Sequence, residues 1–538
     1  MKPSFQAAAF ASLVSLCGAV FATEYSAPEA LVAPSSFKGV HGLAVDKQGR
    51  LLAGSVVGNS IYQVDIDSGE TSVFIGPDQG QADDIAIGPK GEMAWTGFYA
   101  GQLLIRDNDD APIRVVATDL PGMNSLDFND ETGQLYASQV FLGDALWEID
   151  PAGNEAPRLI AKDLGGFNGF EVGSDGWLYG PLWFKGEVVR INPADGQIQT
   201  VATGFGTPAA ANFDSKGNLY AIDTLSGLLK RIDLSSGETT NIAQLSSSLD
   251  NLAIDSQDRI FVSNMADNSI QEVNPATGKV RLITGGKMAV PAGLALTEDG
   301  ADLYVADVFA FRKVDTTSGE VTDLRRAHGS DAEYPISVGL GKERLLLTSF
   351  STGTLHVIDR QDNKTLHMIH GLKAPSGAVE LSNGDIVVSE MESGKLLRLS
   401  GESLDQQQVL SEGLQGPVQM ILGHDGMIYL TEIAGFLTRV DPATGKLERL
   451  VSDLQLPEGL SETADGKFVV AESAAHRLLL VDPATGTKSV LASELPIGFP
   501  AGPGMPPTGI PTGVAVAADG TIFFSSDIDN GLYRLQPE

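Results

Sequence analysis

The chain has 538 residues, a formal net charge of -33 at pH 7 and a hydrophobic content of 42%. This apolar content suffices for sizeable cores, and the length predicts two domains rather than one. The strong negative charge argues against nucleic acid and anionic membranes as partners, because both would repel the protein. The acidic residues are scattered along the chain, which is typical of a solvated surface.

The N-terminal stretch MKPSFQAAAFASLVSLCGAVFA (1–22) is typical of a secretory signal peptide. One early lysine precedes a short apolar segment, and cleavage is predicted after Ala22. We therefore expect a secreted or periplasmic protein. The only cysteine of the chain, Cys17, lies inside this segment, so the predicted mature chain has no disulfide and no cysteine chemistry. The sequence contains no other segment that is long and apolar enough to span a bilayer.

One sequence frame recurs about twelve times along the chain, for example as HGLAVDKQGRLLAG, NGFEVGSDGWLYG and TGVAVAADGTIFFSS. Each copy is an alternating apolar run, a turn with Asp or Gly, and a second apolar run, which predicts a β-hairpin. Further apolar runs separate the copies, and the spacing of roughly 40 to 44 residues is that of a four-stranded propeller blade. Twelve blades exceed one ring, so the sequence predicts an all-β fold of two tandem six-bladed β-propellers, residues 35–286 and 287–538.

The longest departure from this frame is ELPIGFPAGPGMPPTGIPTG (494–513), which separates the last two copies. Its high content of Pro and Gly predicts a loop rather than a strand. We expect this loop to lie as a flap over the second ring.

The leading residue of each copy is expected at the mouth of a central channel, since the first strand of each blade lines that channel. In the first ring these residues are mostly polar: His41, Asp83, Asn124, Asn168, Ala209 and Asp250. In the second ring they are mostly small or apolar: Ala292, Ile336, Ser376, Val418, Glu458 and Thr512. Oxygen donors from separate strands suit Ca²⁺ or another divalent cation, so we predict a metal site formed by Asp83, Asn124, Asn168 and Asp250. The alternative is that these residues only cap strand ends and turns.

Aromatic residues follow the second strands of the first ring, near the same expected mouth. Aromatic side chains beside a polar centre suit a pocket for an apolar or ring-bearing small molecule. The alternative for the aromatic residues of this ring is packing between blades. We predict a substrate pocket that includes Tyr99, Phe141, Trp183 and Phe184.

The phrases MNSLDF (123–128) and FNGFEV (167–172) resemble the Asn-bearing strand starts of the senescence-marker-protein/gluconolactonase family and its paraoxonase and strictosidine-synthase-like relatives. The repeat pattern resembles this six-bladed family over nearly the whole mature chain. The resemblance implies that the asparagines of these phrases hold a catalytic divalent cation, with Asp83 and Asp250 as accompanying carboxylates. The family usually opens its first blade with a glutamate, whereas this chain has His41 there.

These observations predict an exported Ca²⁺-dependent hydrolase of the gluconolactonase type that acts on a lactone or another cyclic ester. The lactone follows from the resemblance alone. The cation would polarise the substrate carbonyl, and His41 or an unligated carboxylate among Asp83 and Asp250 would act as the general base. Two alternatives stay open: a non-catalytic propeller that binds a protein or glycan in the cell envelope, and a lyase of the virginiamycin-cleaving kind.

Overall fold

The computed structural model describes residues 25–77 and 79–538, and the predicted signal peptide lies outside these residues. The regular structure in the described part is β-strand throughout, apart from one 3₁₀ turn at Ser473–Ala475. The strands form twelve four-stranded antiparallel sheets, consistent with the predicted propeller blades. No helix within these two ranges has the length and apolar character that a membrane span requires.

Most sheets follow the chain order of their strands, as one first-lobe sheet illustrates. Its strands are β14 (Glu171–Val172), β15 (Leu178–Leu182), β16 (Glu187–Ile191) and β17 (Ile198–Thr203). In the hairpin between β14 and β15, Oδ1 of Asp175 accepts a hydrogen bond from the backbone N–H of Trp177 at 3.1 Å. Gly176 has a φ of +76°, a left-handed conformation that favours glycine. This geometry explains why Asp–Gly pairs recur at the turns of the repeat.

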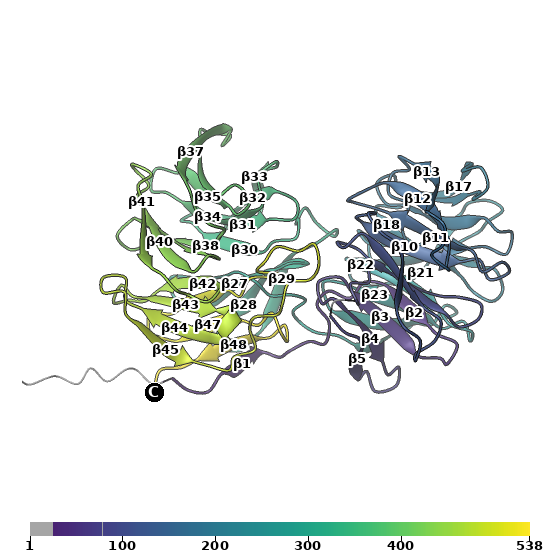
Figure 1. The fold of residues 1–538 in the computed structure, drawn as a ribbon, viewed down its shortest axis with the longest axis horizontal. Coiled ribbons are helices and arrows are strands. Elements are labelled where there is room, and N and C mark those ends of the chain that lie inside the picture. The colour runs from purple at the N-terminus through teal and green to yellow at the C-terminus, as the bar shows by residue number, and fades with distance from the viewer. Residues whose placement is uncertain (1–24, 78) are drawn as a thin grey trace, which may run out of the picture.

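The sheets fall into two groups of six, the first lobe and the second lobe, which lie side by side in Figure 1. The innermost strands of the first lobe are β2 (Leu43–Val45), β6 (Ile85–Ile87), β10 (Met123–Phe128), β14, β18 (Pro208–Phe213) and β22 (Leu249–Ile254). Those of the second lobe are β26 (Leu294–Leu296), β30 (Ser337–Leu340), β34 (Pro375–Glu380), β38 (Pro417–Leu422), β42 (Pro457–Glu462) and β46 (Val514–Val516). Each contacts the next, and the contacts of β22 with β2 and of β46 with β26 complete a cycle in each lobe.

The hydrophobic cores lie between neighbouring sheets. In the first lobe, Ala94 of one sheet shares a buried cluster with Leu126 of the next. In the second lobe, Tyr429 is buried in the same way against Leu460 and Phe468. Side chains alternate between the two faces of a strand, so each sheet presents one apolar face to each neighbour. Stacking of successive sheets therefore buries the alternating apolar runs of the sequence.

The strand β1 (Glu29–Val32) belongs to the second lobe, although it precedes the first lobe in the chain. It pairs antiparallel with β48 (Leu532–Leu535), and Glu29 lies opposite Arg534. This pairing completes the sheet that begins with β46, so both ends of the described chain share one sheet. The predicted range 287–538 does not include β1, because a pairing between the two chain ends leaves no signal in the local sequence.

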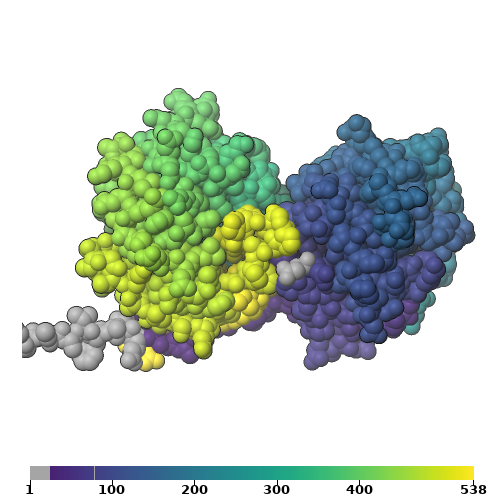
Figure 2. All heavy atoms as spheres, in the orientation of Figure 1, coloured from purple at the N-terminus to yellow at the C-terminus, as the bar shows by residue number. Residues whose placement is uncertain are grey.

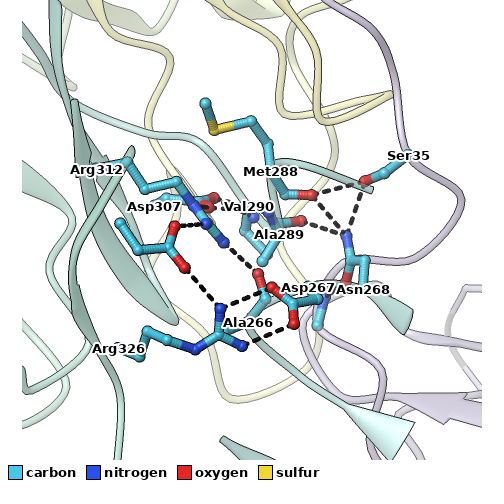
Figure 3. Close-up of polar contacts among 12 residues, drawn as sticks. Ser35, Ala266, Asp267, Asn268, Met288, Ala289, Val290, Asp307, Arg312 and Arg326 are labelled. Atoms are coloured by element: carbon cyan, nitrogen blue, oxygen red, sulfur yellow. Dashed lines mark hydrogen bonds and ion pairs between the residues drawn. The ribbon is translucent and has the colours of Figure 1, made fainter. Parts of the chain in front are cut away.

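Two arginines of the second lobe bind the first lobe at the junction shown in Figure 3. Arg326 donates to both carboxylate oxygens of Asp267, at 2.7 and 2.8 Å. Arg312 donates to the backbone carbonyl oxygen of Ala266 and forms a buried ion pair with Asp307. Charged hydrogen bonds of this kind fix orientation as well as adding energy. The lobes are therefore joined by specific contacts and not only by the chain that connects them.

We expect Val32→Asp to lower the stability of the second lobe. Val32 is 3% exposed and lies in a cluster with Leu294 and Leu303. An unpaired carboxylate at this place costs about 3 kcal/mol or more in the free energy of unfolding. Calorimetry measures the loss. The control Glu29→Ala removes an exposed ion pair with Arg534 and should leave the melting temperature nearly unchanged. Equal losses in both variants would contradict the structural role of β1.

Candidate functional site

A cavity of about 440 Å³ lies between the two lobes, where the innermost strands of the first lobe begin. His41, Asp83, Asn124 and Asp250 belong to the first-lobe wall. Aromatic side chains from both lobes complete much of the lining: Phe98, Tyr99, Phe141, Trp183, Phe184, Phe309, Tyr334 and Phe350. No lysine or arginine is among the described residues that line it. The volume lies within the range of small-molecule binding sites.

Three ionisable side chains of the first lobe meet at this wall. Nδ1 of His41 lies 3.2 Å from Oδ2 of Asp250 and 3.5 Å from Oδ1 of Asp83. Nε2 of His41 is buried and has no hydrogen-bond partner among the residues that the structure describes. A carboxylate at Nδ1 favours the tautomer that carries its proton there, so Nε2 is the nitrogen without a hydrogen-bond partner.

Burial and neighbouring charges shift the pKa values of this cluster. Burial by itself would lower the pKa of His41, but Asp250 and Asp83 raise it above its usual value. Burial raises the pKa of Asp83 to about 8, opposed by His41 and assisted by Asp250. Burial thus favours the protonated, neutral form of the Asp83 carboxyl group at neutral pH. A wall of this kind, without lysine or arginine nearby, suits a ligand without net charge.

The two asparagines of the predicted metal site lie in different surroundings. Asn124 lines the cavity, and its Nδ2 donates to Oδ2 of Asp83. Asn168 is not among the lining residues: its Oδ1 accepts hydrogen bonds from the N–H of Gly169 at 2.9 Å and from the hydroxyl of Ser125 at 3.1 Å. Asn168 is thus connected to the wall through Ser125, whose single hydroxyl proton is shared with Oδ1 of Asn124, also 3.1 Å away.

Two carboxylates and an amide at this wall are donor types that a hard cation takes, but Asn124 turns its Nδ2 and not its Oδ1 towards Asp83. Within residues 25–77 and 79–538, no three His, Cys, Asp or Glu side chains are arranged to hold a metal ion. A cation would therefore need the amide oxygen of Asn124 as well as the carboxylates. Asn168 would have to give up its two hydrogen bonds to join them. Ca²⁺ stays a prediction.

The four aromatic residues predicted for a substrate pocket all line the cavity, at different depths. Trp183 is 6% exposed, whereas Phe141 and Phe184 are 43% and 63% exposed. The ring of Phe141 meets those of Trp183 and Phe184 edge-on, with centroids 5.4 and 5.8 Å apart. Burial raises the pKa of Tyr99 to about 12, so its phenol is neutral. These rings form an apolar rim on the first-lobe side.

The sequence analysis missed the wall that the second lobe supplies. Residues 327–336 connect two strands of that lobe and place His328 in the cavity, with its ring centroid 4.8 Å from that of Trp183. The hydroxyl of Ser248, in the first lobe, donates to the carbonyl oxygen of Ala327 at 2.6 Å. The length of this connection between two strands could have been noticed in the sequence. Its place in the cavity depends on how the lobes dock.

The Pro- and Gly-rich segment 494–513 lies between the two lobes and not over the second lobe alone. Nε2 of Gln81, in the first lobe, donates to the carbonyl oxygen of Pro503 at 3.1 Å. Met505 and Ile510 line the cavity. Figure 2 shows this late part of the chain, coloured yellow, against the blue first lobe. The predicted flap is therefore part of the wall between the lobes.

Comparison with known proteins gives a partial match. Residues 166–308 match the model of a repeat family of unknown function (DUF6923). No curated protein matches the chain. A solved structure, the extracellular domain of a putative one-component system from B. thetaiotaomicron, is 13% identical with a TM-score of 0.33, over 96% of this chain and 79% of that one. The matching family model is not that of the senescence-marker-protein/gluconolactonase family, so that resemblance stays a prediction.

We expect Ca²⁺ to raise the melting temperature of chelator-treated protein, because a ligand that binds only the folded state stabilises it. At a concentration of 100 times Kd the gain is about 2.7 kcal/mol. The rise should disappear in Asn124→Ala, which removes an amide at the cavity wall. It should persist in Glu458→Ala, whose carboxylate is buried in the second lobe. A parent protein that does not respond would contradict the metal prediction.

We expect acidification to destabilise the parent protein more than the variant His328→Phe. Burial lowers the pKa of His328 to about 4 from an ordinary value of 6.5. Between these pH values only the unfolded state takes up the proton, so stability present above pH 6.5 is lost as the pH falls towards 4, by about 1 kcal/mol or more at pH 5.

Denaturant unfolding at pH 8 and pH 5 measures this difference. The control His424→Gln replaces a histidine whose side chain is 73% exposed and should behave like the parent. Identical pH dependence in the parent and His328→Phe would show that His328 is not held neutral by the fold.

Proposed function

We propose that this protein is an exported hydrolase that binds a small neutral molecule, most simply a lactone, in the cavity between two six-bladed β-propellers. The cyclic contacts of the innermost strands support the two propellers, and the leader-like N-terminus supports export. The catalytic part of this proposal rests on the surroundings of His41. Its Nδ1 faces Asp250, and its Nε2 has no hydrogen-bond partner within the described chain. The apolar, aromatic lining supports a neutral substrate.

We assign to His41 the role of general base toward a water molecule. Asp250 at Nδ1 holds the ring and stabilises the imidazolium, and Nε2 of neutral His41 takes a proton from the water as its oxygen attacks the carbonyl carbon. The bond between the carbonyl carbon and the ring oxygen then breaks, and the departing oxygen takes the proton back from Nε2. The product is the hydroxy acid, and His41 returns to its starting state. Asp83, protonated at neutral pH, is less suited to the role of base.

Asp83, Asp250 and Asn124 are the side chains that would hold the predicted cation. When bound, Ca²⁺ would supply Lewis-acid polarisation of the carbonyl group. Asn124 already positions Asp83 through its Nδ2. The proton transfer assigned to His41 does not depend on the cation.

A second candidate function is binding without turnover. The ring of Phe309 packs edge-on against that of His41, with centroids 5.4 Å apart, and this contact limits the room for water beside the imidazole. A ligand held by the aromatic rings would then stay unchanged. The cavity and its preference for a neutral molecule are the same in both proposals.

We expect the parent protein to hydrolyse dihydrocoumarin, a neutral aromatic lactone, and His41→Gln to lose about 10²- to 10⁴-fold in kcat, the usual contribution of a general base. Release of acid, followed with a pH indicator, measures the reaction. His424→Gln, at an exposed position, is the matched control and should keep full activity. Binding of lactones by the parent without any hydrolysis would overturn the hydrolase and favour the second candidate.

A further inference from the structure

We propose that the second lobe is part of the binding site, and that the His328–Tyr334 pair on loop 327–336 hydrogen-bonds the polar group of the ligand. This inference takes the neutral carbonyl ligand from the proposed function, but it does not depend on hydrolysis. It assigns to the second lobe a direct role in ligand recognition, beyond that of a support for the first.

The first step is the position of the pair. Nε2 of His328 lies 2.6 Å from the hydroxyl oxygen of Tyr334, and both side chains line the cavity. The His328 ring meets Trp183 of the first lobe edge-on, at 4.8 Å between centroids. The Tyr334 ring meets Phe309 edge-on at 5.8 Å, and the same Phe309 meets His41 at 5.4 Å. The pair and His41 therefore flank one aromatic ring.

The second step is the backbone that delivers the pair. His328 has a φ of +60° and Tyr334 a φ of +46°, in the left-handed region that residues other than glycine rarely adopt. Such conformations persist only where surrounding contacts impose them, and they are concentrated at functional sites. Here the hydroxyl of Ser248 binds the carbonyl oxygen of Ala327, and Arg326 binds Asp267 at the start of the loop. First-lobe contacts thus hold the loop in place.

The third step is a count of hydrogen atoms. If Nε2 of His328 carries the proton, it donates to the oxygen of Tyr334, whose O–H is then free to donate while Nδ1 can accept. If Nδ1 carries the proton, the Tyr334 hydroxyl donates to Nε2, Nδ1 can donate, and the phenol oxygen can accept. Either tautomer leaves the pair with one free donor and one free acceptor. That combination matches a carbonyl group or the water that attacks it.

The fourth step is charge. Burial lowers the pKa of His328 to about 4, with an opposing contribution from Asp250 and a further lowering from His41. Burial also raises the pKa of Tyr334, with contributions from Tyr99 and nearby carboxylates. The pair is therefore neutral at neutral pH. Both walls of the cavity then favour an uncharged ligand over an ion.

The test uses the full chain and dihydroquinolinone, the lactam analogue of dihydrocoumarin, whose amide resists hydrolysis. Titration calorimetry measures its Kd. We expect Tyr334→Phe, which keeps the ring contact with Phe309, to weaken binding about tenfold, the loss of one buried hydrogen bond. His328→Phe should weaken it equally, and the double variant no further, because each change breaks the same pair. His328→Gln keeps an amide that can bind the Tyr334 hydroxyl and should retain more affinity than His328→Phe.

The matched control is Tyr429→Phe. The phenol of Tyr429 donates to Asp425 at 2.9 Å, outside the cavity, so its loss should leave Kd unchanged. Equal affinity of the parent and a folded Tyr334→Phe, judged by melting temperature, overturns the proposal. So does a parent that does not bind the lactam. Lactam binding that depends on Tyr334, in a protein that leaves dihydrocoumarin intact, overturns the hydrolase and supports the recognition role of the second lobe.

Discussion

The docking of the second lobe onto the first is the constraint on which the cavity depends. Arg326 and Arg312 reach across the junction to Asp267 and to the carbonyl oxygen of Ala266. Guanidinium groups removed from water need such partners, because an unpaired buried charge is costly. These contacts therefore specify one orientation of the lobes. In that orientation, residues of both lobes line the cavity.

The chemistry of the cavity follows from what the two lobes contribute. The first lobe supplies the ionisable cluster around His41, and the second supplies aromatic rings and the neutral His328–Tyr334 pair. Apolar walls exclude water and strengthen the hydrogen bonds inside the cavity. The rim formed by Phe141 and Phe184 stays exposed. In our proposal, this arrangement joins selection for an apolar molecule to recognition of one polar group.

Much of the fold could be predicted from the sequence, because each blade is a local unit. Alternating apolar runs and Asp–Gly turns define hairpins within a few residues, and the repeat spacing indicates four strands per sheet. The leading position of each repeat copy identified His41, Asp83, Asn124 and Asp250, since one frame places equivalent residues at equivalent ends of strands. Asn168 has the same position in its copy of the repeat, but its Oδ1 accepts a hydrogen bond from Ser125 and it does not line the cavity. The repeat pattern does not record this contact.

The amino-acid sequence by itself determined the repeated sheets, the acidic surface and the set of polar residues at the strand starts of one lobe, because all of these arise from local pattern and composition. The tertiary structure decided three other features: the pairing of β1 with β48, the position of segment 494–513, and the entry of His328 into the cavity. Each depends on contacts between residues far apart in the chain. Such contacts form only when the lobes are assembled and dock, so no local pattern records them.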